Sequence, residues 1–138
     1  MSKRREGREA ALQLLYSQDT LPKGAKQDVP EFWNLRRTDE SVQKHAMALQ
    51  QGVLANLRQI DAKITVSLEN FSFERLSQVD KNILRIAVYE MFHDDKVPPV
   101  VSMNEAIEIA KRFGGEDSGR FVNGVLDRLI KDVKRSLR

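Results

Sequence analysis

The stretch SQVDKNILRIAVYEMFHDD, residues 77–95, decides the fold of this chain. It contains neither proline nor glycine, and its apolar residues recur so densely that a helix over it has little polar face. These apolar residues are Val79, Ile83, Leu84, Ile86, Ala87, Val88, Met91 and Phe92. Ser77, followed by Asp80, resembles an N-terminal capping box in which Asp replaces the usual Glu. The stretch therefore predicts a central, largely buried helix, which the prolines of KVPPVV end.

Three helical blocks are expected before this stretch. The first covers residues 5–18, and a short one starts at Pro30, a residue suited to the first helical turn. From residue 39 to 69 the apolar residues recur every three or four positions, which predicts one long amphipathic helix. We expect that helix to bend near Gly52 or Asp61.

Two more blocks follow it. SMNEAIEIAKRFGG, residues 102–115, predicts a helix with a capping box of Ser102 and Glu105 and a glycine stop at Gly114. A last helix begins at Asp117 or Ser118 and carries a continuous apolar stripe. No segment alternates over strand length. The sequence predicts an all-α fold with five major helices and one or two short ones.

Composition limits the class of protein. The chain has 138 residues, 41% of them hydrophobic and 31% charged, which suits one globular domain over residues 1–138. It has no cysteine, so disulfides and thiolate metal sites are excluded. No apolar run reaches the roughly 18 residues of a membrane span, and the N-terminus lacks the apolar segment of a signal peptide. We expect a cytoplasmic protein without a membrane partner.

The charge is distributed unevenly. Residues 1–8 carry four cations and one acid, and residues 120–138 carry six cations and two acids. The stretch between them has thirteen cations and seventeen acids. Basic ends around an acidic middle suit a protein with one nucleic-acid surface and another partner elsewhere. They also suit helix ends that are merely solubilised by Lys and Arg, and composition alone favours neither interpretation.

The N-terminal cations are placed against the helix dipole. Lys3, Arg4, Arg5 and Arg8 crowd the first turns of the first helix, where the dipole favours acids. Either this segment is a solvated tail or an anion binds there. Guanidinium groups bind phosphate in a bidentate manner and stack on bases, so with Tyr16 two turns on the cluster suits RNA. We expect these cations to project beyond the bundle and to be replaceable without unfolding it.

Catalytic and metal sites find little support. Glu90 and His93 have the i, i+3 spacing used in di-iron bundles, but no second Glu-x-x-His exists. We predict no catalytic residue, no metal site and no cofactor. In KRFGGEDSGRF, residues 111–121, two glycines could expose backbone N–H groups to a phosphate. A helix C-cap followed by an N-cap explains the same residues, and the local sequence favours this structural interpretation.

Three segments resemble the bacterial NusB-type transcription antitermination factors. They are REAALQLLY (residues 8–16), VDKNILRIAVYEM (79–91) and VPPVVSMNEAIEIAKRFGGEDSGRFVNGVLD (97–127). The resemblance covers essentially the whole chain. It implies a compact all-helical domain of two packed subbundles without catalytic activity. It also implies a partner, the small-subunit ribosomal protein NusE, and joint binding of the single-stranded boxA element of nascent RNA, notably in ribosomal RNA operons. Other Nus factors and RNA polymerase would complete the antitermination complex.

The resemblance also implies particular contact residues. The RNA-binding positions would be Lys3, Arg4, Arg5, Arg8, Tyr16, Lys111, Phe113, Ser118, Arg120 and Phe121. Those facing NusE would be Tyr16, Glu74, Asp80 and Asp117. Glu6 and Gly7 interrupt the basic run, so we expect modest affinity for RNA without the partner. Asp80 would combine its capping contact with a role at the partner surface.

Two other functions stay open at this point. The fold is shared by the N-terminal RNA-binding module of a ribosomal RNA methyltransferase, but that enzyme would need a long cofactor-binding domain after Arg138. A helical interaction adaptor without an RNA role would use the acidic middle and leave the basic ends idle. Some family members form homodimers, and the sequence does not decide between monomer and dimer. Nor does it decide whether the connector over residues 19–38 is ordered.

Overall fold

The computed structural model describes the backbone of residues 2–136 and the side chains of residues 2–133. All regular elements in this range are helical. They are α1 (Lys3–Thr20), α2 (Val29–Arg36), α3 (Glu40–Ala55), α4 (Leu57–Val66), the short 3-10 helix η1 (Phe73–Arg75), α5 (Gln78–His93) and α6 (Pro99–Ser136). The predicted all-α class is confirmed. The basic side chains after residue 133 lie outside the described part of the chain.

The predicted central helix is α5. Ser77 caps it, because the Ser77 hydroxyl oxygen accepts the backbone N–H of Asp80 at 3.0 Å. Most of its residues are buried, since α1, α3, α4 and α6 all pack against it. The dense apolar pattern thus reports a helix that is covered on nearly all sides.

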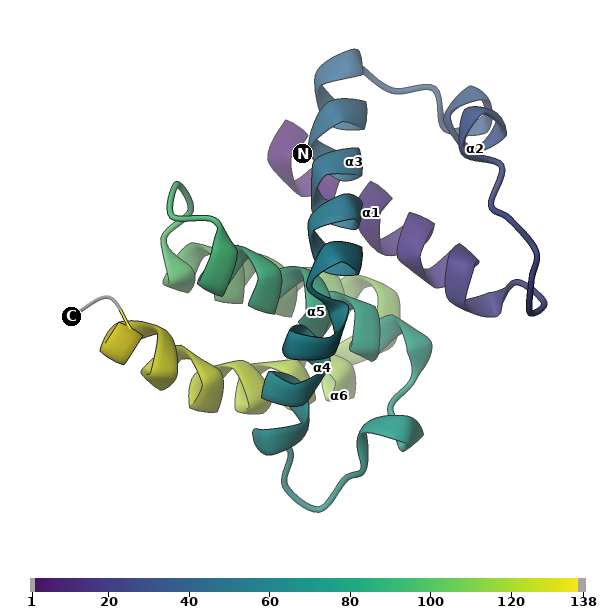
Figure 1. Cartoon of the computed structure of the whole chain (residues 1–138). Coiled ribbons are helices and arrows are strands. Elements are labelled where there is room, and N and C mark those ends of the chain that lie inside the picture. The colour runs from purple at the N-terminus through teal and green to yellow at the C-terminus, as the bar shows by residue number, and fades with distance from the viewer. Residues whose placement is uncertain (1, 137–138) are drawn as a thin grey trace.

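The helices form two groups that meet at α5. Figure 1 shows α1, α2 and α3 in the upper part of the molecule and α4, α5 and α6 in the lower part. Within the upper group α1 packs along α3, and within the lower group α5 packs along α6. The α1 helix also contacts α5, so the first half of the chain rests on the second.

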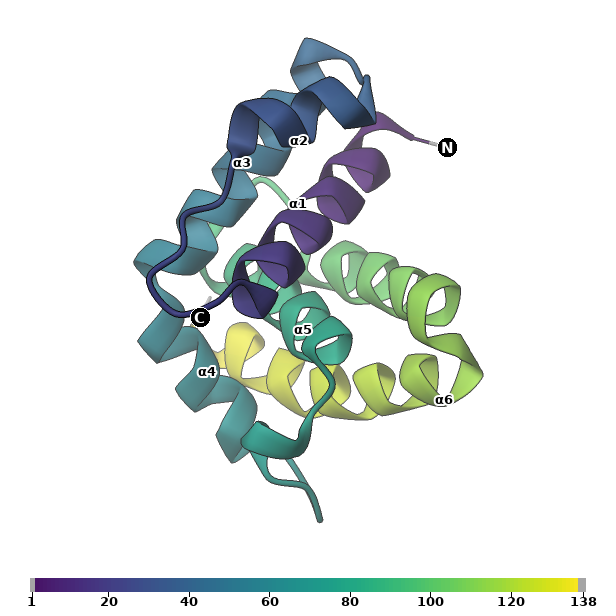
Figure 2. The same cartoon turned by 90° about the vertical axis from the view of Figure 1, so that its right-hand side faces the viewer.

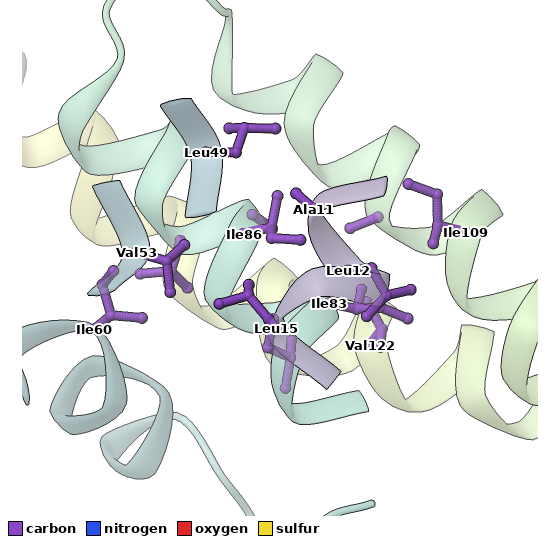
Figure 3. Packing of buried hydrophobic residues seen from close by; sticks show 14 of the residues in the cluster. Ala11, Leu12, Leu15, Leu49, Val53, Ile60, Ile83, Ile86, Ile109 and Val122 are labelled. Atoms are coloured by element: carbon purple, nitrogen blue, oxygen red, sulfur yellow. The ribbon is translucent and has the colours of Figure 1, made fainter. Parts of the chain in front are cut away.

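One hydrophobic core joins both groups. Figure 3 shows buried side chains of α1, α3, α4, α5 and α6 directed into the same interior, among them Leu12, Leu49, Ile86 and Val122. Burial of these apolar groups supplies the main driving force for folding. The core holds α1 against the other helices and so sets where its basic N-terminal turns lie.

The long helix expected over residues 39–69 is two helices. The break falls at Asn56, which has φ −121° and ψ 19°, rather than at Gly52 or Asp61. The Asn56 side-chain amide donates to the carbonyl of Gly52 at 2.8 Å and so satisfies an acceptor at the end of α3. Gly52 instead provides space, because a Cβ there would lie 2.2 Å from the ring of Tyr89.

The prediction for residues 102–115 is wrong at both ends. Helix α6 begins at Pro99, so Ser102 lies inside it and does not cap it. Glu105 pairs with arginines of α1 instead of closing a capping box. The interruption falls at Gly115, with φ 85° and ψ −175°, one residue after the expected Gly114. Glycine adopts this positive φ without the penalty that a side chain would bring. Figure 2 shows that the two halves of α6 fold back on each other there.

A polar cluster ties three helices together at the far end of α1. The Arg85 guanidinium donates to both carboxylate oxygens of Asp61 at 2.8 and 2.9 Å and to Asp19 at 3.2 Å. These acids come from α4 and from α1, while Arg85 belongs to α5.

Among the described helices none is long and apolar enough to cross a membrane.

Candidate nucleic-acid interface

The first turn of α1 holds the exposed cations of the N-terminus. The Ser2 hydroxyl oxygen caps the helix by accepting the N–H of Arg5 at 3.1 Å. Lys3 is exposed and pairs with Asp39 at 2.9 Å. Arg4 is exposed and has no ion-pair partner within the described part of the chain. Lys3 and Arg4 therefore project from the bundle, as expected.

Arg8 does not project from the bundle. Its side chain is 3% exposed, and its Nε and Nη2 atoms donate to the two carboxylate oxygens of Glu90 at 2.8 and 2.9 Å. Its Nη1 atom donates to Glu105 at 3.2 Å. The expectation that Arg8 reaches into solvent is wrong. We no longer expect it to be replaceable without loss of stability, because a buried Glu90 needs a positive partner.

Arg5 has an intermediate position. It is partly exposed, and its Nε donates to Glu105 at 3.1 Å, with a second contact from Nη2 to the same oxygen. The hydrogen bond from Arg5 lowers the pKa of the Glu105 carboxyl below its ordinary value. Two of the four N-terminal cations, Arg5 and Arg8, thus pair with acids of α5 and α6. Their placement near the positive end of the helix dipole is explained partly by these acids.

Gly7 lets α1 approach α3 closely. A Cβ at this position would lie 2.3 Å from Nδ1 of His45, so no larger residue fits without displacing that ring. Gly7 therefore interrupts the basic run for a packing reason.

His45, which packs against Gly7, has a perturbed pKa. Burial, and then the charges of Arg8 and Arg4, lower it.

The exposed cations of α1 border a groove of about 510 Å³. Lys3, Arg4 and Arg8 line it from α1 with the N-cap Ser2 beside them, and Lys96, Val97 and Pro98 line it from the turn between α5 and α6. Glu105 and Val101 of α6 complete it. We call it the N-terminal groove. Lys96 was missed in the sequence, because it lies about 90 positions from Arg4 and no local pattern joins them.

A second groove, of about 370 Å³, lies where α5 begins and α6 turns at Gly115. Asp80, Asp117, Ser118 and Phe121 line it, so the structure brings together four of the residues expected at the RNA and partner surfaces. We call it the kink groove. Ser118 is buried and donates its hydroxyl proton to Asp80. Phe121 packs edge-on against the exposed Phe71, with ring centroids 5.4 Å apart.

The remaining candidates are exposed but do not line the kink groove. They are Tyr16, Glu74, Lys111, Phe113 and Arg120. Lys111 lies 3.6 Å from Glu108, and Arg120 pairs with Asp117, in both cases within one helical turn. Such exposed pairs contribute little to stability. These cations therefore remain accessible to an anionic partner.

The first half of α6 connects the two grooves. Arg5 contacts Glu105, and Arg112 contacts Glu9 at 3.1 Å, so α1 and this part of α6 run side by side. From Glu105 to Gly115 the helix rises by roughly 15 Å. The grooves thus lie near opposite ends of this part of α6. Within the described residues no group of three or more His, Cys, Asp or Glu side chains could hold a metal ion.

The fold and the two charged grooves define a small all-helical binding protein. The chain belongs to the NusB family, whose family model matches residues 5–131. This confirms the resemblance of the three segments. The family consists of transcription antitermination factors and not of enzymes.

Individual relatives agree with this assignment over nearly their whole length. The transcription antitermination protein NusB of Geobacter sp. (strain M21) is 44% identical over 141 residues, which cover 96% of this chain and 97% of the relative. A solved structure of NusB from T. maritima is 38% identical with a TM-score of 0.80, over 94% of this chain and 91% of that one. A crystal structure of antitermination factors NusB and NusE in complex with double-stranded RNA has a TM-score of 0.83 at 26% identity, over 96% and 98% of the two chains.

Proposed function

We propose that this chain, acting as one domain over residues 1–138, binds the boxA element of nascent RNA together with NusE. The complex would join other Nus factors on RNA polymerase and oppose premature termination, notably in ribosomal RNA operons. The observation that carries the proposal is the exposed pair Lys3 and Arg4 at the start of α1. The fold shared with a NusB that was solved with NusE and RNA supports it.

The proposed RNA path begins at these cations. From there it follows the face formed by α1 and the first half of α6, where Arg5 is partly accessible. Tyr16, Lys111, Phe113, Arg120 and Phe121 would supply cations and aromatic rings farther along. Single-stranded RNA suits such a face, because phosphates pair with Lys and Arg while bases stack on rings.

Two of the expected RNA contacts receive a different role in this proposal. Arg8 is nearly inaccessible, and it would act by holding Glu105 and thereby positioning Arg5. Ser118 is buried and bonded to Asp80, so it would position that carboxylate. Both residues shape the surface without contacting RNA.

The proposed NusE surface is the kink groove. Asp80 and Asp117 give it negative charge beside one cation, Arg75, and the exposed Phe71 and half-buried Phe121 give it apolar area. A ribosomal protein is rich in basic residues, so charge complementarity would guide their association. Glu74 and Tyr16 would contribute at the margins of this surface.

Fluorescence anisotropy with labelled boxA RNA tests the proposal. Binding is measured against a scrambled RNA, with and without purified NusE, across a salt series. We expect preference for boxA in the presence of NusE and a fall of log K by about 0.7 per phosphate contact for each unit of log salt. Equal and weak binding of both RNAs, with NusE still bound, would make the protein an adaptor without an RNA role.

A further inference from the structure

The N-terminal groove contains a cation that the expected RNA-binding positions do not include. Lys96 belongs to the turn between α5 and α6, yet it lines the same groove as Lys3 and Arg4 of α1. Its backbone N–H donates to the carboxylate of Asp94 at 3.0 Å, which orders the turn at this point. The side chain of Lys96 is thus presented from a hydrogen-bonded turn.

The cations around this groove differ in whether the protein already neutralises them. Arg8 pairs with Glu90 and Glu105, and Lys3 pairs with Asp39. Arg4 and Lys96 are exposed and have no ion-pair partner in the part of the chain that the structure describes. Their charges are available to a ligand.

Few acids compete for these two charges. Glu105 is the acidic residue that lines the groove, and it is occupied by Arg5 and Arg8. Asp94 accepts the backbone N–H of Lys96, and the exposed Asp95 lies beside it on the same turn. Asp94 and Asp95 do not line the groove, and among the side chains that do, the four cations outnumber Glu105, an excess that attracts an anion.

The groove also has apolar walls. Val101 is 41% exposed on the first turns of α6, whereas Val97 of the turn is buried and offers little area to a ligand. Pro98 lies between them in the sequence and also lines the groove. A nucleotide matches this combination, because its phosphate needs cations while its sugar and base cover apolar surface.

We infer that the N-terminal groove binds a backbone phosphate of the RNA between Arg4 and Lys96, so that the RNA path extends from α1 onto the α5–α6 turn. The inference rests on the proposed RNA-binding function and adds a contact residue to it. Phosphate contacts position an RNA strand and carry no sequence information themselves. The groove would therefore contribute affinity and register, and other positions would contribute the preference for boxA.

The test compares Lys96→Gln, Arg4→Gln and the double variant in the full-length protein with NusE. The matched control is Lys23→Gln, an exposed lysine in the connector beyond the opposite end of α1. We expect each groove variant to weaken RNA binding and to lower the salt slope, and the double variant to lower it by about 0.7, because one phosphate contact is lost. The control should leave affinity and slope unchanged. Thermal unfolding should be the same for all four, since these side chains are exposed.

Scrambled RNA separates this inference from the proposed function. Because a phosphate contact ignores sequence, the slope changes should appear with boxA and with scrambled RNA alike. If boxA and scrambled RNA bind equally well while the groove variants still lower the salt slope, the proposed function is overturned and the phosphate contact in the groove is supported. An unchanged slope for Lys96→Gln beside a lowered one for Arg4→Gln would overturn the groove. Weaker binding of NusE to Lys96→Gln without RNA would also overturn it, because the groove would then bind a protein surface.

Discussion

Arg8 and Glu90 form a bidentate ion pair in the interior, with distances of 2.8 and 2.9 Å between their atoms. The side chains are 3% and 1% exposed. Burial opposes the charged form of Arg8, but the hydrogen bond and charge of Glu90 outweigh it, and the pKa of the guanidinium is raised. An arginine in the basic N-terminal run thus connects α1 to the central helix.

Arg8→Ala should destabilise the fold strongly. Removing one partner of a buried ion pair leaves the other charge without compensation, which costs about 3–5 kcal/mol. We expect the urea midpoint to fall accordingly with little change in the slope of the transition. Equilibrium urea unfolding followed by circular dichroism measures both quantities.

The matched comparison for Arg8 is Arg4→Ala. Arg4 lies one helical turn earlier and is exposed, so its replacement should change the free energy of unfolding by no more than about 0.5 kcal/mol. Similar small changes for both variants would show that the Arg8–Glu90 pair contributes nothing to stability. A combined alanine variant of Arg4, Arg5 and Arg8 is therefore unsuitable for mapping RNA contacts.

Glu105→Gln should increase affinity for RNA. Glu105 accepts hydrogen bonds from Arg5 and Arg8 and lines the N-terminal groove, so it offsets positive charge at the proposed RNA surface. Without that charge Arg5 is free to bind a phosphate, and we expect the salt slope of RNA binding to rise by about 0.7. Anisotropy titrations across a salt series measure this change.

Glu69→Gln provides the control for Glu105. Glu69 is also a paired carboxylate, 3.7 Å from Arg128, but it lies beyond α4 and away from α1. The substitution Glu69→Gln removes the same amount of charge from the whole protein as Glu105→Gln does. If both variants raise affinity equally, net charge is the cause and the position of Glu105 is irrelevant.

The central features of the fold follow from local sequence. The apolar residues of α5 and the Ser77 cap are short-range signals, and both are present in the structure as predicted. The break at Asn56 has no such signal, because an asparagine within a continuous apolar pattern is compatible with an unbroken helix. Ser102 and Glu105 show the opposite case, since a correct capping spacing is overridden by tertiary ion pairs.

The candidate site is predictable to a smaller extent. Lys3 and Arg4 are exposed as expected, and Asp80, Asp117, Ser118 and Phe121 share one groove. The acids that pair with the buried Arg8 lie more than 80 residues away in the sequence. The basic run alone therefore could not distinguish a structural arginine from an accessible one. Lys96 escapes prediction for the same reason, because only the folded chain brings its turn to α1.

Gly7→Ala should destabilise the protein although alanine favours helices. The new Cβ would lie 2.3 Å from Nδ1 and 3.2 Å from Cβ of His45, so the ring and its attachment must both move. Overpacking of this kind costs about 1–3 kcal/mol, which exceeds the gain of roughly 1 kcal/mol in helix propensity. Thermal and urea unfolding should both show the loss.

Gly124→Ala serves as the opposite case. Gly124 lies within α6, and a Cβ there would meet only Nη1 of Arg128 at 3.7 Å, an ordinary contact. We expect this variant to be more stable by about 0.5–1 kcal/mol.

A second comparison combines Gly7→Ala with His45→Ala. The double variant should lose less free energy of unfolding than the sum of the single losses. Additive losses would show that the two residues do not press on each other.

Stability should fall in two stages as the pH is lowered. The pKa of His45 is below its ordinary value of 6.5, because of burial and then the charges of Arg8 and Arg4. The unfolded chain therefore takes up a proton near pH 6.5 that the folded chain does not, and the free energy of unfolding decreases below that pH. The decrease stops once the pH is below the folded-state pKa.

The second stage belongs to Glu105, whose pKa is lowered from 4.5 mainly by the hydrogen bond from Arg5. Its contribution is fully present above pH 4.5 and is lost below it, because the unfolded carboxyl is protonated first. Urea unfolding from pH 8 to pH 3.5 should show both stages. His45→Gln should remove the first stage and keep the second, while Glu105→Gln should do the reverse, so each variant is the control for the other. A profile for His45→Gln that still declines between pH 7 and pH 5.5 would assign the first stage to another group.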